Sequence, residues 1–174
     1  MKSKLALFLA VAILTTLVAL PATASAAITL TPAEKKIVSL VNKARTERGL
    51  HKLYVKPCLV RAARAHSAEM GGEQYFDHDS FSGDSFARRL IKFGYKRAGY
   101  SFWKVGEDIA WGSGLYSAPE VIFDGWMHSK AHRAVILTKR FRNIGVGVKV
   151  CDEGYGGCTD PVTFFTLDLG RRID

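Results

Sequence analysis

Two β-rich runs near the end of the chain place the strongest constraint on its fold. Residues 143–150 and 162–169 are rich in β-branched and apolar side chains, and only the Gly-rich segment 151–161 separates them. So short a connection cannot make a parallel crossover, because a crossover needs a dozen or more residues and usually a helix. The two runs are therefore predicted to form an antiparallel pair.

The rest of the mature chain alternates between helical and extended patterns. A capping box at Thr31, Pro32 and Glu34 opens a helix that Gly49 stops, and Pro57 opens a second helix that ends at Gly71 and Gly72. Further helices are expected from Asp84 to Phe93 and, behind a Ser117 and Glu120 capping box, around Trp126, with a third strand at residues 105–111. Helices before and after a strand pack on both sheet faces, which predicts an α+β protein built as a three-layer α/β/α sandwich around a central antiparallel sheet of three or more strands.

The N-terminus has the pattern of a secretory signal peptide. Lys2 and Lys4 precede an apolar run that ends before Pro21, and the small residues Ala24 to Ala26 offer a cleavage site. We expect residues 1–26 to be removed and residues 27–174 to form one domain outside the cell. No later segment has the roughly 20 consecutive apolar residues of a transmembrane helix.

The chain carries a formal charge of +9, which falls to about +7 when Lys2 and Lys4 leave with the signal. Surplus positive charge suits an anionic wall or membrane surface, although net charge alone does not select a partner. Export makes nucleic acid an improbable ligand. The densest basic cluster is Arg88, Arg89, Lys92, Lys96 and Arg97, and its spacing favours a solvated helix face over a polyanion groove.

Three cysteines in an oxidising compartment leave one unpaired in a monomer. Cys151 and Cys158 flank the Gly-rich turn between the two final strands, so we expect a disulfide that staples this hairpin. Cys58 follows Pro57 in a first helical turn and is interpreted as a small buried apolar residue without a chemical role.

Three polar residues stand outside the regular apolar faces and are the candidates for chemistry. His78 follows the second helix, Glu107 lies on an apolar strand, and His132 opens a helical turn. Two imidazoles and a carboxylate are ligand types that hold Zn²⁺ with an open position, and the same trio can serve as general acid and base without metal. Their spacing does not choose between these roles.

Other catalytic signatures are absent. His128 and His132 are four residues apart, as in a zinc-protease helix, but Ser129 replaces the required Glu. Ser129 lacks a nucleophile elbow and is better interpreted as an N-cap, and a Cys58–His66 pair would be buried.

Taken in order, the motifs of this chain closely resemble the CAP superfamily, whose name joins cysteine-rich secretory proteins, antigen 5 and pathogenesis-related proteins. The resemblance is to the short bacterial secreted branch, with its SCP-like extracellular domain, and runs from about Ile37 to Leu169. It is carried by Leu40, Val41, Asn42, Arg45, Gly49, Leu50, His66, Met70, Phe76 to His78, Gly106 to Ala110, Trp126 to Ser129, His132, Arg133 and Ile144 to Gly147.

This resemblance implies a central cleft with two His and two acidic residues, in which some members hold a divalent metal such as Zn²⁺ between the histidines. By position, the implied residues are His78, Glu107 and His132. Ser129 stands where many eukaryotic members have the second acid, and Asp124 cannot replace it because five residues along a helix turn a side chain about 140° away. Asp108 and His128 stand where bacterial members commonly have Asn.

Two functions from different classes follow. The first is a binding module whose His/Glu/His cleft holds a divalent metal or a lipid, peptide or wall-derived ligand of the cell envelope, and the missing acid favours it. The second is an extracellular hydrolase of wall glycan or peptide that uses Glu107 as acid or base together with His78 and His132.

Overall fold

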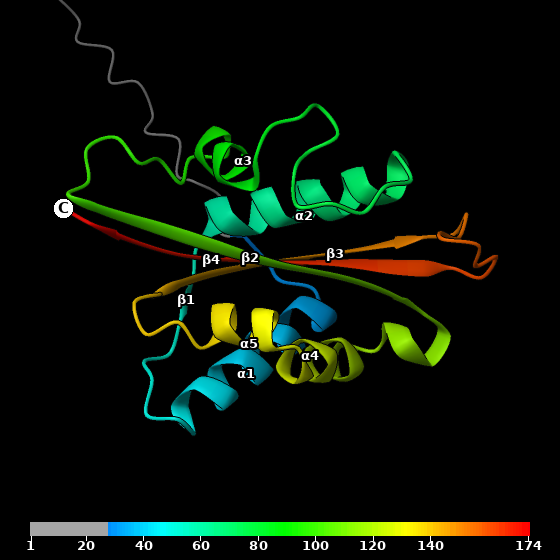
Figure 1. Ribbon diagram of the computed structural model, residues 1–174, viewed down its shortest axis with the longest axis horizontal. Coiled ribbons are helices and arrows are strands. Elements are labelled where there is room, and N and C mark those ends of the chain that lie inside the picture. The colour runs from blue at the N-terminus through cyan, green and yellow to red at the C-terminus, as the bar shows by residue number, and fades with distance from the viewer. Residues whose placement is uncertain (1–27) are drawn as a thin grey trace, which may run out of the picture.

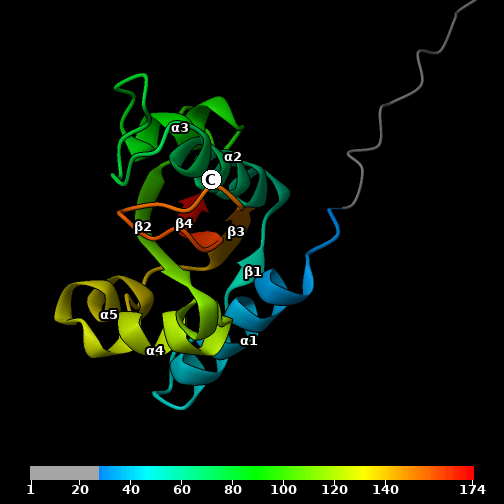
Figure 2. The same cartoon turned by 90° about the vertical axis from the view of Figure 1, so that its right-hand side faces the viewer.

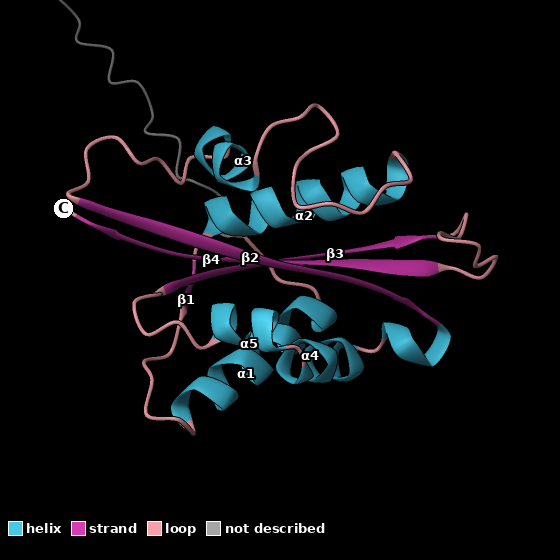
Figure 3. Ribbon diagram, in the orientation of Figure 1, coloured by secondary structure: helices cyan, strands magenta, loops and turns pink. Residues whose placement is uncertain are grey.

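The computed structural model describes residues 28–174, so the predicted signal peptide lies outside the described residues. A twisted sheet separates two helical layers, with α2 and α3 on one face and α1, α4 and α5 on the other (Figure 1). The helices are α1 (Pro32–Thr46), α2 (Pro57–Gly72), α3 (Phe86–Lys92), α4 (Pro119–His128) and α5 (Lys130–Ile136), with a 3-10 turn, η1, at Gly114–Ser117. The strands are β1 (Tyr54–Val55), β2 (Phe102–Ser113), β3 (Asn143–Cys151) and β4 (Val162–Ile173), as Figure 3 shows. The predicted three-layer α+β architecture is confirmed.

The strand order is β1-β3-β4-β2, which leaves β2 at one edge of the sheet. The predicted hairpin is confirmed, because β3 and β4 pair antiparallel from Asn143 opposite Gly170 to Cys151 opposite Val162. β2 also pairs antiparallel with β4 over its whole length. The sheet is nevertheless mixed, since the two-residue strand β1, which the sequence pattern did not predict, runs parallel to β3.

Helix boundaries follow local capping chemistry. The Thr31–Glu34 capping box of α1 is present in both directions. The predicted capping box at Ser117 is wrong, because α4 begins at Pro119 after Ala118, and Ser117 Oγ instead donates to the Gly114 carbonyl of η1 at 2.7 Å. A Pro at the first helical position is already preorganised and needs no amide partner.

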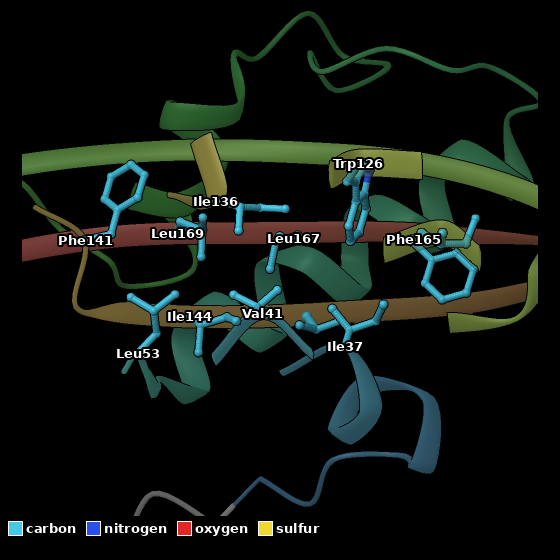
Figure 4. Close-up of a cluster of buried hydrophobic side chains, with 12 residues drawn as sticks. Ile37, Val41, Leu53, Trp126, Ile136, Phe141, Ile144, Phe165, Leu167 and Leu169 are labelled. Carbon is cyan, nitrogen blue, oxygen red and sulfur yellow. The ribbon is translucent and has the colours of Figure 1, made fainter. Parts of the chain in front are cut away.

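The largest core cluster lies between the sheet and the layer of α1, α4 and α5 (Figure 4). Its buried members are Ile37, Val41, Leu53, Ile122, Trp126, Ile136, Phe141, Ile144, Val146, Phe165, Leu167 and Leu169. Trp126 also donates its indole N–H to the Ile109 carbonyl of β2 at 3.1 Å. This bond fixes α4, and the α5 that follows it, against the edge strand.

The opposite face packs unusually close to α2. A Cβ at Gly145 would lie 2.2 Å from the Leu59 carbonyl carbon, and one at Gly147 would lie 2.2 Å from backbone atoms of Ala63 and Arg64. The glycines of β3 therefore let the helix backbone rest directly on the sheet. Ser67 of α2 adds hydrogen bonds to the Gly147 carbonyl at 3.1 Å and to the Thr166 hydroxyl at 2.9 Å.

The predicted Cys151–Cys158 disulfide is not formed, and all three cysteines are free. The two sulfurs have different neighbours: a Cβ at Gly71 would lie 2.0 Å from Cys151 Sγ, whereas Cys158 Sγ donates to Ser113 Oγ at 3.2 Å. Backbone hydrogen bonds between Tyr155 and Cys158 restrain the turn instead. Among the described helices, none is long and apolar enough to cross a membrane.

Candidate functional site

The loop between α2 and α3 is anchored from two sides, and this fixes the backbone around His78. His66, fully buried on α2 as its helical position predicted, donates Nε2–H to the Asp77 carbonyl at 2.9 Å. Arg89 of α3 donates to the His78 carbonyl at 3.1 Å and to Ser80 Oγ at 2.9 Å. Burial lowers the pKa of His66, so this histidine is neutral and its role is to hold the loop backbone.

Glu107 of β2 is the acceptor at the centre of the site. Its side chain is 0 % exposed, and its Oε1 accepts from His78 Nδ1 at 2.8 Å while its Oε2 accepts from Arg89 Nη2. The hydrogen bond to Glu107 raises the pKa of His78, whose ring remains 47 % exposed. Glu107 thus orients His78 and leaves its Nε2 free for another partner.

Asp108 points to the opposite face of the sheet from Glu107, because successive side chains of a strand alternate. A Cβ on its face-mate Gly106 would contact Phe141 and Val135, which places this face on the side of α5. Asp108 is only 1 % exposed, and burial raises its pKa to about 8. The charge of His78 acts to lower this pKa and that of Glu107 acts to raise it, but burial is the larger effect.

His132 comes from α5, in the other helical layer. Its Nδ1 is buried and has no hydrogen-bond partner within the described residues. Burial lowers the pKa of His132, and the nearby His78 lowers it further. Figure 2 shows α3 and α5 lying above and below the same edge strand, β2.

Asp168 is a site residue that the sequence reasoning missed. It lies directly opposite Glu107 in the β2–β4 ladder and is fully buried. No conventional donor within residues 28–174 reaches either of its carboxyl oxygens. Burial first and the Glu107 carboxylate second raise the pKa of Asp168 well above its usual range. Asp168 is therefore a neutral acid whose hydroxyl can donate to Glu107.

The interpretation of the basic cluster as a solvated helix face is wrong for Arg89. Arg88 and Lys92 are exposed and pair with Asp84, as a solvated face predicts, but Arg89 is 4 % exposed and bonds to Glu107. The available signal was its spacing, since Arg89 lies three residues after Phe86 and beside Leu90 on the apolar stripe of α3.

The remaining positions that the resemblance singled out are Ser129, Asp124 and His128. Ser129 occupies the N-cap position of α5, although its side chain makes no capping hydrogen bond. Asp124 and His128 have side chains 71 % and 79 % exposed and pair with each other at 3.2 Å, so neither supplies the missing acid. Across residues 28–174, no three His, Cys, Asp or Glu side chains converge tightly enough to hold a metal by themselves.

Residues 38–169 match the cysteine-rich secretory protein family. Because this match covers most of the chain, the protein belongs to that family, the CAP superfamily.

Two relatives come from Bacillus subtilis. YkwD, described as an uncharacterized protein, is 38% identical over 125 residues, which are 72% of this chain and 46% of YkwD. YlbC, described as an uncharacterized membrane protein, is 32% identical over 118 residues, which are 68% of this chain and 32% of YlbC. The chain thus spans less than half the length of both relatives.

Solved structures agree with the fold. An extracellular protein containing an SCP domain from Bacillus anthracis superposes with a TM-score of 0.62 at 25% identity, covering 83% of this chain and 45% of that one. An outer surface protein of Borrelia burgdorferi gives a TM-score of 0.61 at 19% identity, covering 79% of this chain and 91% of that one. The second likeness bears on the fold alone.

Proposed function

We propose that this protein is an exported CAP module that binds a ligand of the cell envelope through a divalent cation, with Zn²⁺ the first choice, at His78 and His132. The observation that carries the proposal is the pair of imidazoles delivered from opposite helical layers to the edge of β2. His132 presents a buried Nδ1 without a partner in the described chain, and His78 presents Nε2 because Glu107 occupies its Nδ1. The extracellular SCP-domain relative supports an external location.

The two histidines suit such a cation because a carboxylate supports one of them. A carboxylate that accepts the second N–H of a histidine fixes the ring and raises its basicity, and Glu107 stands in this relation to His78. Two protein ligands leave coordination positions for water and for oxygens of a bound molecule. A bound Zn²⁺ would polarise a carboxylate, carbonyl or phosphate oxygen of that ligand. Among the protein's own residues, Glu107 orients the ring of His78.

The alternative function, hydrolysis of wall glycan or peptide with Glu107 as acid or base, has the His78–Glu107 hydrogen bond in its favour. Against it, the Glu107 side chain is fully buried and both of its oxygens are engaged, so it cannot touch a substrate directly. Any proton exchanged with a ligand would move at His78 Nε2. This arrangement favours binding over turnover.

The test is metal analysis of protein purified without chelator, followed by calorimetric titration with Zn²⁺. Wild type is compared with His78→Ala/His132→Ala and with the matched control His51→Ala/His128→Ala, which removes two histidines outside the site. We expect one Zn²⁺ per wild-type and control chain and a loss of at least tenfold in affinity in the first variant, with thermal unfolding of all three retained. Equal binding by all three proteins, or no binding by wild type, contradicts the cation site.

A further inference from the structure

A second feature of the surface lies away from the histidine site, at the end of the sheet where β4 finishes and β3 begins. Two neighbouring grooves of about 550 and 320 Å³ open there and share the side chains of Arg142 and Arg171. Six lysine and arginine residues line them, namely Lys56, Lys139, Arg140, Arg142, Arg171 and Arg172. Asp174 lines the larger groove and is the acid among its lining residues. His78, Glu107 and His132 line neither groove.

Two of the guanidinium groups in these grooves, those of Arg142 and Arg172, are held in place. Arg142 Nη1 donates to the Lys139 and Phe141 carbonyls at 2.7 and 2.8 Å. The guanidinium of Arg172 stacks on the rings of Tyr95 and Tyr100, 4.5 and 4.6 Å from their centroids. Fixed guanidiniums lose little side-chain entropy on binding an anion, and their planar fork matches phosphate oxygens.

These cations are also crowded. Within residues 28–174, no carboxylate lies within 4.0 Å of any of the six basic groups, although Lys56, Arg142, Arg171 and Arg172 are half-buried. Burial and then the neighbouring Arg171 lower the pKa of Arg142. Half-buried like charges without counterions destabilise the free protein, and an anion that bridges them removes this cost.

We propose that the paired grooves are a binding site for the phosphate groups of a flexible linear polyanion, separate from the site of His78 and His132. A single phosphate can engage Arg142 and Arg171 where the grooves meet. A chain with repeated phosphates can continue into both grooves and reach Lys56 on one side and Arg140 on the other. Because the cations line recessed grooves rather than a raised face, a chain reaches them more completely than a flat membrane surface does.

The experiment measures binding of long-chain inorganic polyphosphate to the full protein by calorimetry at low salt. The test variant Arg142→Gln/Arg171→Gln is compared with Lys35→Gln/Lys149→Gln, which removes the same charge from exposed positions on α1 and β3. We expect at least a tenfold loss in the test variant, a change within about twofold in the control, and a shallower salt dependence in the test variant. Of the two arginines, Arg142 makes side-chain hydrogen bonds, so Arg171→Gln alone removes one charge without breaking these bonds. Thermal unfolding reports on the fold of each variant.

Two further probes separate the sources of phosphate. Inorganic orthophosphate should bind at least tenfold more weakly than polyphosphate, and vesicles of phosphatidylglycerol and phosphatidylcholine should not show the Arg142/Arg171 sensitivity. If the test and control variants lose the same affinity for polyphosphate, the loss reflects net charge alone and the proposed site is wrong. If vesicle binding depends on these two arginines and polyphosphate does not bind, the ligand is a lipid surface and the proposal of a linear polyanion is wrong.

Discussion

Replacing Asp108 by Asn should make the protein more stable at neutral and alkaline pH. Asp108 is 1 % exposed, and its Oδ2 has no hydrogen-bond partner within residues 28–174. Burial raises its pKa from 3.8 to about 8, so the folded protein carries it as a neutral acid at pH 7. Asn has nearly the same shape and is neutral at every pH, so the substitution removes the titration while keeping the packing.

The sign follows from proton binding. Between pH 3.8 and about 8 the unfolded chain has released the Asp108 proton and the folded chain retains it, so stability falls as the pH rises through this window. A gap of about four pH units at about 1.4 kcal/mol each sets a ceiling of roughly 6 kcal/mol at pH 8. Structural relaxation and water penetration reduce such effects, and we expect about 2–3 kcal/mol.

The assay is urea unfolding of wild type and Asp108→Asn at pH 5, 6.5 and 8. The stability difference between the two proteins isolates Asp108 from the other groups that titrate, Asp168 included. We expect the free energy of unfolding of Asp108→Asn, relative to that of wild type, to increase steadily from pH 5 to pH 8. A difference that stays constant from pH 5 to pH 8 would refute the neutral-acid interpretation, because a packing effect does not depend on pH.

Four further substitutions test the structure itself, each by urea unfolding at pH 7. Arg45→Ala should cost at least about 3 kcal/mol, because the buried guanidinium donates to four backbone carbonyls that would lose their donor. Gly147→Ala should cost about 3 kcal/mol or more, since its Cβ would meet the α2 backbone at 2.2 Å, whereas Gly125→Ala meets nothing within 4 Å and should gain up to about 1 kcal/mol. Asp168→Asn should leave stability within about 1 kcal/mol of wild type or higher, because the Asn amide can replace the acid's hydroxyl as donor to Glu107; a loss of several kcal/mol would mean that Asp168 is ionised.

Local signals predicted most of the fold. The Thr31–Glu34 capping box, Pro57 at the start of α2 and the long β3–β4 hairpin are determined by residues close in sequence, and each is confirmed. β1 was not predictable from its pattern, because its two residues become a strand only by pairing with Asn143 and Ile144, almost ninety positions away. The start of the fourth helix was misplaced by one residue, because Pro119 takes the first helical position and Ala118, not Ser117, is the N-cap.

The candidate site, like the fold, was predictable from the sequence only in part. His78 and His132 were proposed through their family motifs, since spacing alone does not place a loop and a helix from opposite layers relative to one edge strand. Arg89 and Asp168 were missed because charged residues inside apolar patterns are usually solvated, and only the assembled sheet reveals that both face Glu107. A polar residue interrupting an apolar stripe was the available signal in both cases.

Burial also changes what the net charge of +9 means. Four acids are withdrawn from the surface, namely Glu34, Glu107, Asp108 and Asp168, whereas only two cations among the described residues are fully buried, Arg45 and Arg89. Of the four acids, Asp108 and Asp168 are held neutral, so they offset none of the exposed lysines and arginines at pH 7. The surface is therefore more basic than the composition suggests, and its field draws anions toward the Arg142 and Arg171 grooves.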